Sequence, residues 1–464
     1  MLARLLPSTS LTRRGTGFLV CAAAALLAGW VMGRRDLLTL AVFLAALPAA
    51  SVVLLRLARP RLDIRRSFTP PVVEAGAPAT VRLAVSAPRL PVASVTMHEG
   101  LPARFGQSPA FHFPPLSARG ALRADYEYRL RSSRRGVYRI GPAGAVFTDP
   151  FGLARADQEL GGSDRLVVAP APLPLPSPYP DAAGGPDGTV LHSRPGGPSD
   201  DEAATRGYRP GDPMRRVHWA ATARHGQLMV RQEHPISTPW ATLLLDRREA
   251  AHGRSAAAPV WEESPDLPTS DSFEWCVTMA VSAAAHLVGA GWALSAVDQT
   301  GRPMLAGSSS CADPDRDEFV GGAGLQDFAE GLAALGLQPN GLESGQESAF
   351  GPPLADRLAE ARWRGPLIAV LGTLTIAEAR ALAALAGTGG QAFALLAVGA
   401  PGVAREGIRL LRNAGWQVAA VTPDTPVPVA WSMLDALPAG RAPGTSAPVQ
   451  PVPAGGPGAA GGRR

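Results

Sequence analysis

Two apolar stretches near the start of the chain constrain its fold most. The first, GFLVCAAAALLAGWVMG, runs from Gly17 to Gly33 without a charged residue, and the second, LLTLAVFLAALPAASVVLL, runs from Leu37 to Leu55. Each is close to the roughly 17 to 25 residues that a helix needs to cross a bilayer. Because only the charged segment RRD separates them, the two helices must form an antiparallel transmembrane hairpin, assigned to residues 1–60. The alternative is a cleaved signal peptide followed by one anchor helix.

The arginines around this hairpin predict its orientation. Two arginines, Arg34 and Arg35, lie in the connecting loop, whereas eight flank the hairpin: Arg4, Arg13, Arg14, Arg56, Arg59, Arg61, Arg65 and Arg66. Basic residues collect on the cytoplasmic side of a membrane. The pattern therefore predicts a multi-pass protein of the cell membrane with both termini in the cytoplasm. The widely spaced cysteines Cys276 and Cys311 fit a reducing compartment.

The composition excludes some chemistry. All 44 basic residues are arginine, so a P-loop and Schiff-base catalysis, which need a lysine, cannot occur. The chain is basic, with a pI of about 9.6, which ordinarily raises the expectation of nucleic-acid binding. Alanine, arginine, glycine and proline are all abundant, however, which indicates a coding bias, so we give the basicity little weight.

After the hairpin the pattern changes to short alternating runs such as ATVRLAV and LRADYEYRLR, separated by Pro and Gly. This alternation predicts antiparallel strands and a small β-sandwich over residues 61–168. Within it, RRGVYRIGP predicts a strand and a turn. DPFGL predicts a tight turn with Phe151 and Leu153 directed inward. A Pro/Gly-rich linker or strap follows over residues 169–205.

The C-terminal half alternates apolar strand-like runs with helical runs. PLIAVLG, AFALLAV and WQVAAV are continuous apolar runs, separated by TIAEARALAALAG and VAREGIRLLRNAG. Buried strands alternating with helices predict an α/β domain with a doubly wound, Rossmann-like parallel sheet. We assign it to residues 206–436 and expect a disordered tail over residues 437–464.

A dense motif, GYRPGDPMRRVHW, opens this α/β region. Its Pro-Gly and Asp-Pro pairs predict turns, and RRVHW and QLMVRQE alternate like strands. We expect Trp219 to be buried at a structural corner and the arginines to pair with Asp212, Glu233 or the carboxylates of a partner. A contact face for a partner is the alternative. The candidate interaction residues are Tyr208, Gly211, Asp212, Arg215, Arg216, His218, Trp219, Arg224 and Arg231.

The segment TRGYRPGDPMRRVHWAATARHGQLMVRQEH, from Thr205 to His234, resembles the signature of the bacterial family catalogued as domain of unknown function 58. The upstream RRGVYRIGP and DPFGL segments and the two-helix start are similar to the same family. The resemblance implies a von Willebrand factor A-like α/β domain after the signature. It also implies partnership with a MoxR-type AAA ATPase and a membrane transglutaminase-like protein.

In von Willebrand factor A-like domains the first strand usually ends in Asp-x-Ser-x-Ser, which holds a divalent cation. This chain has LLLDRREAA, so Arg248 and Ala250 stand where hydroxyls would be needed. A guanidinium repels a cation that needs oxygen ligands. We therefore expect a degenerate site at Asp246 without metal, with Asp246 capping or pairing locally with an arginine.

No catalytic residue and no cofactor is predicted. Cys276 and His286 lie ten residues apart on one expected helix, about 15 Å along its axis, so they cannot form a nucleophile–base pair. The sequence thus predicts a non-catalytic, membrane-anchored adaptor that works with a MoxR-type AAA ATPase in assembly or maturation of client complexes, without nucleic acid. The alternatives are a membrane-bound enzyme of undetected type and a nucleic-acid-binding protein.

Overall fold

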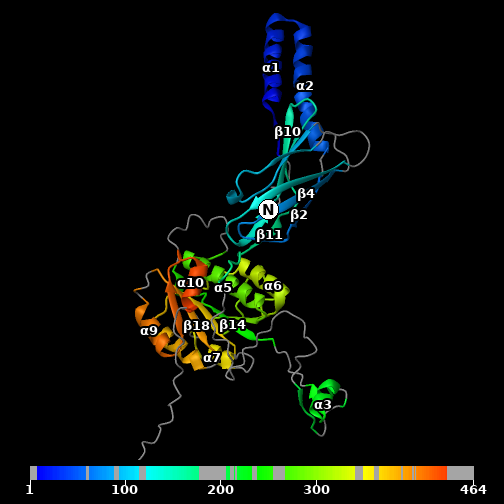
Figure 1. The fold of residues 1–464 in the computed structure, drawn as a ribbon. Helices are drawn as coiled ribbons and strands as arrows, with labels where there is room; N and C mark the ends of the chain where they lie inside the picture. The colour runs from blue at the N-terminus through cyan, green and yellow to red at the C-terminus, as the bar shows by residue number, and fades with distance from the viewer. Residues whose placement is uncertain are drawn as a thin grey trace, which may run out of the picture.

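The computed structural model describes residues 8–58, 62–87, 94–113, 122–176, 205–209, 214, 217–231, 238–253, 267–339, 349–359, 365–387, 390–399, 402 and 404–435. The predicted tail and most of the predicted linker lie outside these residues. A helical hairpin stands at one end of the molecule, β-sheets lie in the middle and an α/β part lies at the other end (Figure 1).

The hairpin consists of α1 (Arg13–Met32) and α2 (Arg35–Ala58). Gly33 joins them in a left-handed conformation, with a φ of 64°, which glycine adopts without a steric penalty. Both helices are long and apolar enough to cross a membrane. Most of their large apolar side chains, among them Leu27 and Trp30, are exposed.

The base of the hairpin is built into the β-sheets. Strand β1 (Ser8–Leu11) precedes α1 and pairs antiparallel with β10 (Ala154–Leu160). At the other end, Leu55 in the last turns of α2 is buried in a core that it shares with Leu83 and Phe147. The apolar run Leu37–Leu55 is therefore not all available to lipid, because protein covers one side of its last turn. A sequence pattern cannot distinguish these two apolar surroundings.

Three sheets form the middle part. The first has the order β1-β10-β9-β5-β6, the second β2-β4-β7 and the third β3-β11-β8. The strands not yet given are β2 (Asp63–Thr69), β3 (Val72–Glu74), β4 (Pro78–Ala87), β5 (Ser94–His98), β6 (Ala110–Phe113), β7 (Leu122–Arg131), β8 (Gly136–Ile140), β9 (Ala143–Thr148) and β11 (Asp164–Ala169). Leu83 and Val85 of the second sheet pack on Met97 and Phe147 of the first. The strand-rich prediction for this stretch is confirmed.

One detail of this region differs from expectation. Leu153 is buried as expected, but Phe151 in the same DPFGL turn is 63% exposed. Hydrogen bonds from the backbone to the Asp149 side chain explain the difference. The Asp149 carboxylate accepts the amides of Phe151 and Ala154, at 2.9 and 2.6 Å. These bonds close a turn in which the Leu153 side chain is buried in the protein and the Phe151 side chain is exposed.

The α/β part contains a six-stranded sheet of order β16-β15-β14-β17-β18-β19. Its strands are β14 (Trp240–Leu245), β15 (Ala293–Asp298), β16 (Glu318–Phe319), β17 (Leu367–Leu371), β18 (Ala392–Ala397) and β19 (Gln417–Val421). Neighbours are parallel except β16, which runs antiparallel to β15 at one edge. The predicted strands PLIAVLG, AFALLAV and WQVAAV correspond to β17, β18 and β19.

Helices cover both faces of this sheet. Because side chains alternate along a strand, Leu243 and Leu245 face one core, while Leu244 faces the other. The first core contains α5 (Asp271–Gly289), α6 (Gly321–Ala333) and α10 (Val427–Asp435). The second contains α7 (Pro352–Ala359), α8 (Ile376–Ala383) and α9 (Arg405–Asn413). The sheet is therefore doubly wound, with an apolar layer on each side.

Arg135 joins the β-sheets to the α/β part. It precedes β8, and its buried guanidinium donates to both carboxylate oxygens of Glu274 in the first turn of α5, at 2.9 Å each. It also donates to the carbonyl oxygen of Leu332 at the end of α6. This charge-assisted, bidentate contact stabilises the junction and also fixes the orientation of α5 relative to β8.

Candidate functional site

Asp246 lies directly after β14, at the carboxyl edge of the six-stranded sheet. Its side chain is completely buried, and its amide donates to the carbonyl oxygen of Val370 on the neighbouring strand, at 3.0 Å. Ligands of doubly wound sheets bind outside the carboxyl ends of the strands. Asp246 therefore occupies the place where a functional group is expected.

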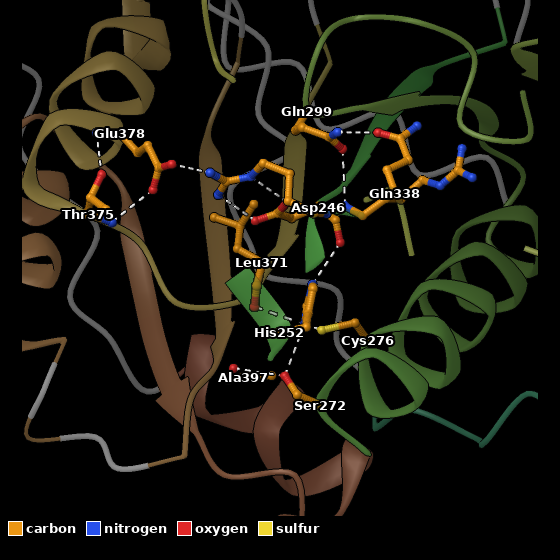
Figure 2. Close-up of polar contacts among 12 residues, drawn as sticks. Asp246, His252, Ser272, Cys276, Gln299, Gln338, Leu371, Thr375, Glu378 and Ala397 are labelled. Atoms are coloured by element: carbon orange, nitrogen blue, oxygen red, sulfur yellow. Dashed lines mark hydrogen bonds and ion pairs between the residues drawn. The ribbon is translucent and has the colours of Figure 1, made fainter. Parts of the chain in front are cut away.

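Arg248 occupies both oxygens of this carboxylate. Its Nε donates to Oδ1 at 2.9 Å and its Nη2 to Oδ2 at 2.8 Å, while its backbone amide also donates to Oδ1. Its Nη1 is bonded to Glu378 (Figure 2), and its Cζ lies 5.2 Å from the ring centroid of Phe350. The expected local pairing of Asp246 with an arginine is confirmed. One guanidinium thus bridges two carboxylates from different elements.

The protonation of this cluster follows from its surroundings. Burial lowers the pKa of Arg248, but the hydrogen bonds and charge of Asp246, together with those of Glu378, outweigh burial and leave that pKa above its ordinary value. The guanidinium is therefore a permanent cation. A divalent ion would have to displace it to reach Asp246. No group of three or more His, Cys, Asp or Glu side chains in the described ranges is arranged to hold a metal ion.

Glu378 is a member of the cluster that the sequence analysis missed. It is the third residue of α8, where Thr375 accepts the Glu378 amide and Glu378 Oε2 accepts the Thr375 amide at 2.8 Å. This reciprocal capping box orients the carboxylate, whose other oxygen binds Arg248. The pattern Thr-x-x-Glu in TIAE was the available signal, although it carries no information about the long-range partner.

The neighbouring Arg247 is also buried, and carbonyl oxygens hold it. Its guanidinium donates to Met304, Ala306 and Gly336 at 2.8–3.3 Å. Burial lowers its pKa to about 10, against an opposing effect of Asp298. Its backbone amide donates to Gln299 Oε1 at 3.1 Å. These contacts fix the loop after β14 rather than leaving a group free to react.

His252 closes the other side of the site. Burial lowers its pKa, so the ring is neutral at neutral pH. Its Nε2 lies 2.8 Å from the Asp246 carbonyl oxygen, which can only accept, so Nε2 carries the proton and Nδ1 is the acceptor. Nδ1 lies 3.0 Å from Ser272 Oγ, which also lies within donating distance of the Ala397 carbonyl oxygen. The ring therefore ties the loop after β14 to the start of α5 (Figure 2).

The two residues considered for catalysis make packing contacts, Cys276 in the interior and His286 in a half-buried position. Cys276 is buried and its Sγ lies 3.8 Å from the Leu371 carbonyl oxygen. Burial raises its pKa well above the usual range, which disfavours the nucleophilic thiolate. His286 lies edge-on to Trp431, with ring centroids 5.6 Å apart. Both contacts are packing contacts rather than a nucleophile–base pair.

The GYRPGDPMRRVHW motif forms a separate small unit. Strands β12 (Thr205–Gly207) and β13 (Met229–Arg231) pair with each other, and α3 (Trp219–His225) lies between them in sequence. Figure 1 shows α3 apart from the six-stranded sheet. Gly211, Asp212, Arg215 and Arg216 lie outside the described residues, as does the side chain of Arg231 at the end of β13.

Two expectations for this motif were wrong. Trp219 is 65% exposed rather than buried, and it begins a helix rather than continuing a strand. His218 explains the helix, because its Nδ1 accepts the amide of Ala221 at 3.1 Å and so caps the first turn. Tyr208 is half-buried, with its amide bonded to the Leu228 carbonyl oxygen. Arg224 is exposed on the last turn of α3.

No protein-family model matches the chain, and no curated protein matches it. Among solved structures, a CARDB domain from Pyrococcus furiosus in complex with di-metal ions is 14% identical, with a TM-score of 0.14, over 22% of this chain and 89% of that one. An alkylpurine DNA glycosylase from Pseudomonas fluorescens, bound to DNA with an abasic-site analogue, is 16% identical with a TM-score of 0.16. That match covers 31% of this chain and 41% of the glycosylase.

Proposed function

We propose that this protein is a non-catalytic, membrane-anchored adaptor. In this proposal the hairpin holds it in the cell membrane with both termini in the cytoplasm, and a von Willebrand factor A-like domain presents a contact face to other proteins. By the resemblance of its signature to domain of unknown function 58, the partners are a MoxR-type AAA ATPase and a membrane transglutaminase-like protein.

The connection between β1 and β10 supports a hairpin that spans the membrane twice. The register pairs Ser8 with Asp157 and Leu11 with Ala154, so the segment before α1 and the sheet after α2 lie on the same side of the hairpin. Cleavage of α1 as a signal peptide would remove β1 from that sheet. The excess of flanking arginines favours the cytoplasm for this side.

The strand order of the α/β part supports the domain type. Counted along the chain, the six strands lie in the order 3-2-1-4-5-6, and the third is antiparallel at the edge. This is a doubly wound order with its carboxyl-edge site next to the first strand. Asp246 follows that first strand, where the resemblance implies the degenerate cation site.

The single observation that carries a non-catalytic role is the occupation of Asp246. Both of its oxygens bind Arg248, whose remaining bond goes to Glu378. A buried carboxylate whose two oxygens are both bonded to a guanidinium has no oxygen directed at a substrate or a metal ion. The site is thus suited to holding the loop after β14 in one shape for a partner to contact.

Helix α3 is the proposed contact face. An exposed tryptophan is costly in water, and both tryptophan and arginine are enriched at the centres of interfaces. Trp219 and Arg224 are exposed on this short helix, and Met214 just before it is also exposed. A rigid helix with one large aromatic and a cation fits a groove with an acidic rim.

Co-purification of the full chain with its partner tests the proposal. Trp219→Ala and Arg224→Glu should keep the parent melting temperature, because exposed residues contribute about 0 to 1 kcal/mol, and should lower capture of a co-expressed MoxR-type ATPase. Arg409→Glu, an exposed arginine on α9, is the matched control and should capture normally. Equal capture by all three variants would refute the contact face.

A further inference from the structure

The turn from Asp149 to Leu153 is wedged against both helices of the hairpin. Thr12 Oγ1 donates to the Gly152 carbonyl oxygen at 2.6 Å, and the Thr12 amide donates to the Leu153 carbonyl oxygen at 2.9 Å. From the second helix, Ser51 Oγ donates to the Asp149 carboxylate at 3.0 Å. The turn is therefore fixed at one level along the hairpin.

Phe151 projects from this fixed turn. Its ring is 63% exposed, although its amide is tied to Asp149 Oδ2 at 2.9 Å. The turn therefore presents an uncovered aromatic side chain next to the two apolar helices. Phenylalanine is among the side chains that enter the boundary between headgroups and acyl chains when they lie at a membrane surface.

Positive charge lies at the same level. Arg13 and Arg14 begin α1, and both are exposed. Nη1 of Arg14 lies 3.8 Å from the position that a Cβ on Gly152 would occupy, which places the guanidinium over the turn that carries Phe151. Guanidinium groups bind phosphate through paired hydrogen bonds.

The length of the hairpin beyond this turn fits a bilayer. From Thr16 to Met32 the helix rises about 25 Å, close to the roughly 30 Å of a hydrocarbon core. Its exposed side chains in this section include Val20, Leu27 and Trp30. The membrane surface on the side of the β-sheets is then expected at the turn, close to the level at which one side of α2 joins the protein core at Leu55.

We propose that this turn is a lipid-contact element, in which Phe151 enters the bilayer interface and Arg13 and Arg14 bind the headgroup phosphates of anionic phospholipids. The inference rests on the proposed membrane anchoring and adds a specific lipid class and three residues to it. It makes the β-sheets lie directly on the membrane instead of extending from it on a tether.

Photocrosslinking in nanodiscs tests it with the full-length protein. Phe151 is replaced by p-benzoylphenylalanine in discs of equimolar phosphatidylcholine and phosphatidylglycerol, and lipid adducts are identified by mass spectrometry. The same replacement at Leu27, exposed on α1, reports hairpin insertion. At Val320, exposed in the α/β part, it is the negative control. We expect adducts at Phe151 and Leu27 and none at Val320.

The outcomes separate the two levels of the proposal. Adducts at Leu27 without adducts at Phe151 would overturn the lipid-contact element and leave the anchoring intact. No adduct at either position would overturn the anchoring itself.

Lipid selectivity tests the role of the arginines. Phosphatidylglycerol should be enriched over phosphatidylcholine in the Phe151 adducts by at least about fivefold, equivalent to about 1 kcal/mol for a basic side chain at an anionic surface. Arg13→Gln with Arg14→Gln should bring the ratio close to that of the disc, whereas Arg409→Gln should not change it. An unchanged ratio in the double variant would refute headgroup binding by these two arginines.

Discussion

The variant Arg248→Ser tests whether the Asp246 carboxylate can be buried at the carboxyl edge of the sheet only because the Arg248 guanidinium neutralises it. Asp246 is fully buried and the Arg248 side chain is 14% exposed, so water that enters in place of the guanidinium leaves the carboxylate without its counter-charge. The Glu378 side chain keeps 23% exposure and can regain water, so the cost falls mainly on one buried charge. Removing one partner of a buried pair costs about 3 to 5 kcal/mol.

Thermal unfolding of the full chain in detergent measures this cost. For a domain of this size each kcal/mol lowers the melting temperature by about 2 to 4 °C, so Arg248→Ser should lower it by about 6 to 20 °C. Arg409→Ser is the exposed control and should lower the melting temperature by only about 0 to 4 °C, because an exposed charge contributes about 0 to 1 kcal/mol. The new serine also adds an oxygen ligand beside Asp246, so Mg²⁺ or Mn²⁺ should restore part of the loss in Arg248→Ser and leave the parent unchanged.

Two results would refute this reasoning. An Arg248→Ser protein that melts with the parent would mean that Asp246 does not depend on the guanidinium. A parent protein that Mn²⁺ stabilises, with the effect lost in Asp246→Asn, would mean that a cation reaches the carboxylate despite Arg248.

Three further predictions concern the junctions between parts. Arg135→Gln should lower the free energy of unfolding by about 3 kcal/mol at neutral pH. Burial raises the pKa of Glu274 but Arg135 more than offsets this effect, so the stabilisation is present above the ordinary carboxyl range and should fade below about pH 4. A difference between parent and variant that does not depend on pH would contradict this prediction. Gly15→Ala would place a Cβ 2.1 Å from the Leu153 carbonyl oxygen and should destabilise the hairpin junction by about 1 to 3 kcal/mol. Faster proteolysis of the variant would report this loss, whereas unchanged proteolysis would show that α1 can shift. Leu55→Ala should cost about 2 to 5 kcal/mol in thermal unfolding, and a neutral result would place that side chain in lipid rather than in the protein core.

Much of the α/β architecture could be predicted from the sequence because its strands are buried on both faces. Continuous apolar runs such as Ala392–Ala397 have no other common explanation when helical segments separate them. The local pairing of Asp246 with an arginine could also be predicted, since Arg248 lies two residues after Asp246 in LLLDRREAA. Glu378 could not, because its contact with Arg248 spans 130 residues and depends on the order of strands in the sheet.

The errors have a common physical origin. The exposure of Phe151 and Trp219 and the burial of Leu55 depend on what lies beside each residue in space, and an apolar side chain has the same sequence signal in all these surroundings. The short strand β1 was missed because STSL is too short and polar to show a strand pattern. Trp219, the last residue of the predicted strand RRVHW, begins helix α3 instead, because the cap formed by His218 outweighed the alternation.

The pairing of β1 with β10 imposes a sequence of events on biogenesis. Ser10 and Arg155, whose side chains meet across this ladder, are 145 residues apart, and both helices of the hairpin lie between them. The first strand leaves the ribosome long before its partner exists, so its backbone groups stay in water while the hairpin is made. In the proposed membrane anchoring, insertion into the bilayer should therefore come first and sheet closure last, and a hairpin inserted in the wrong direction would leave β10 with an unpaired edge that quality-control proteases can recognise.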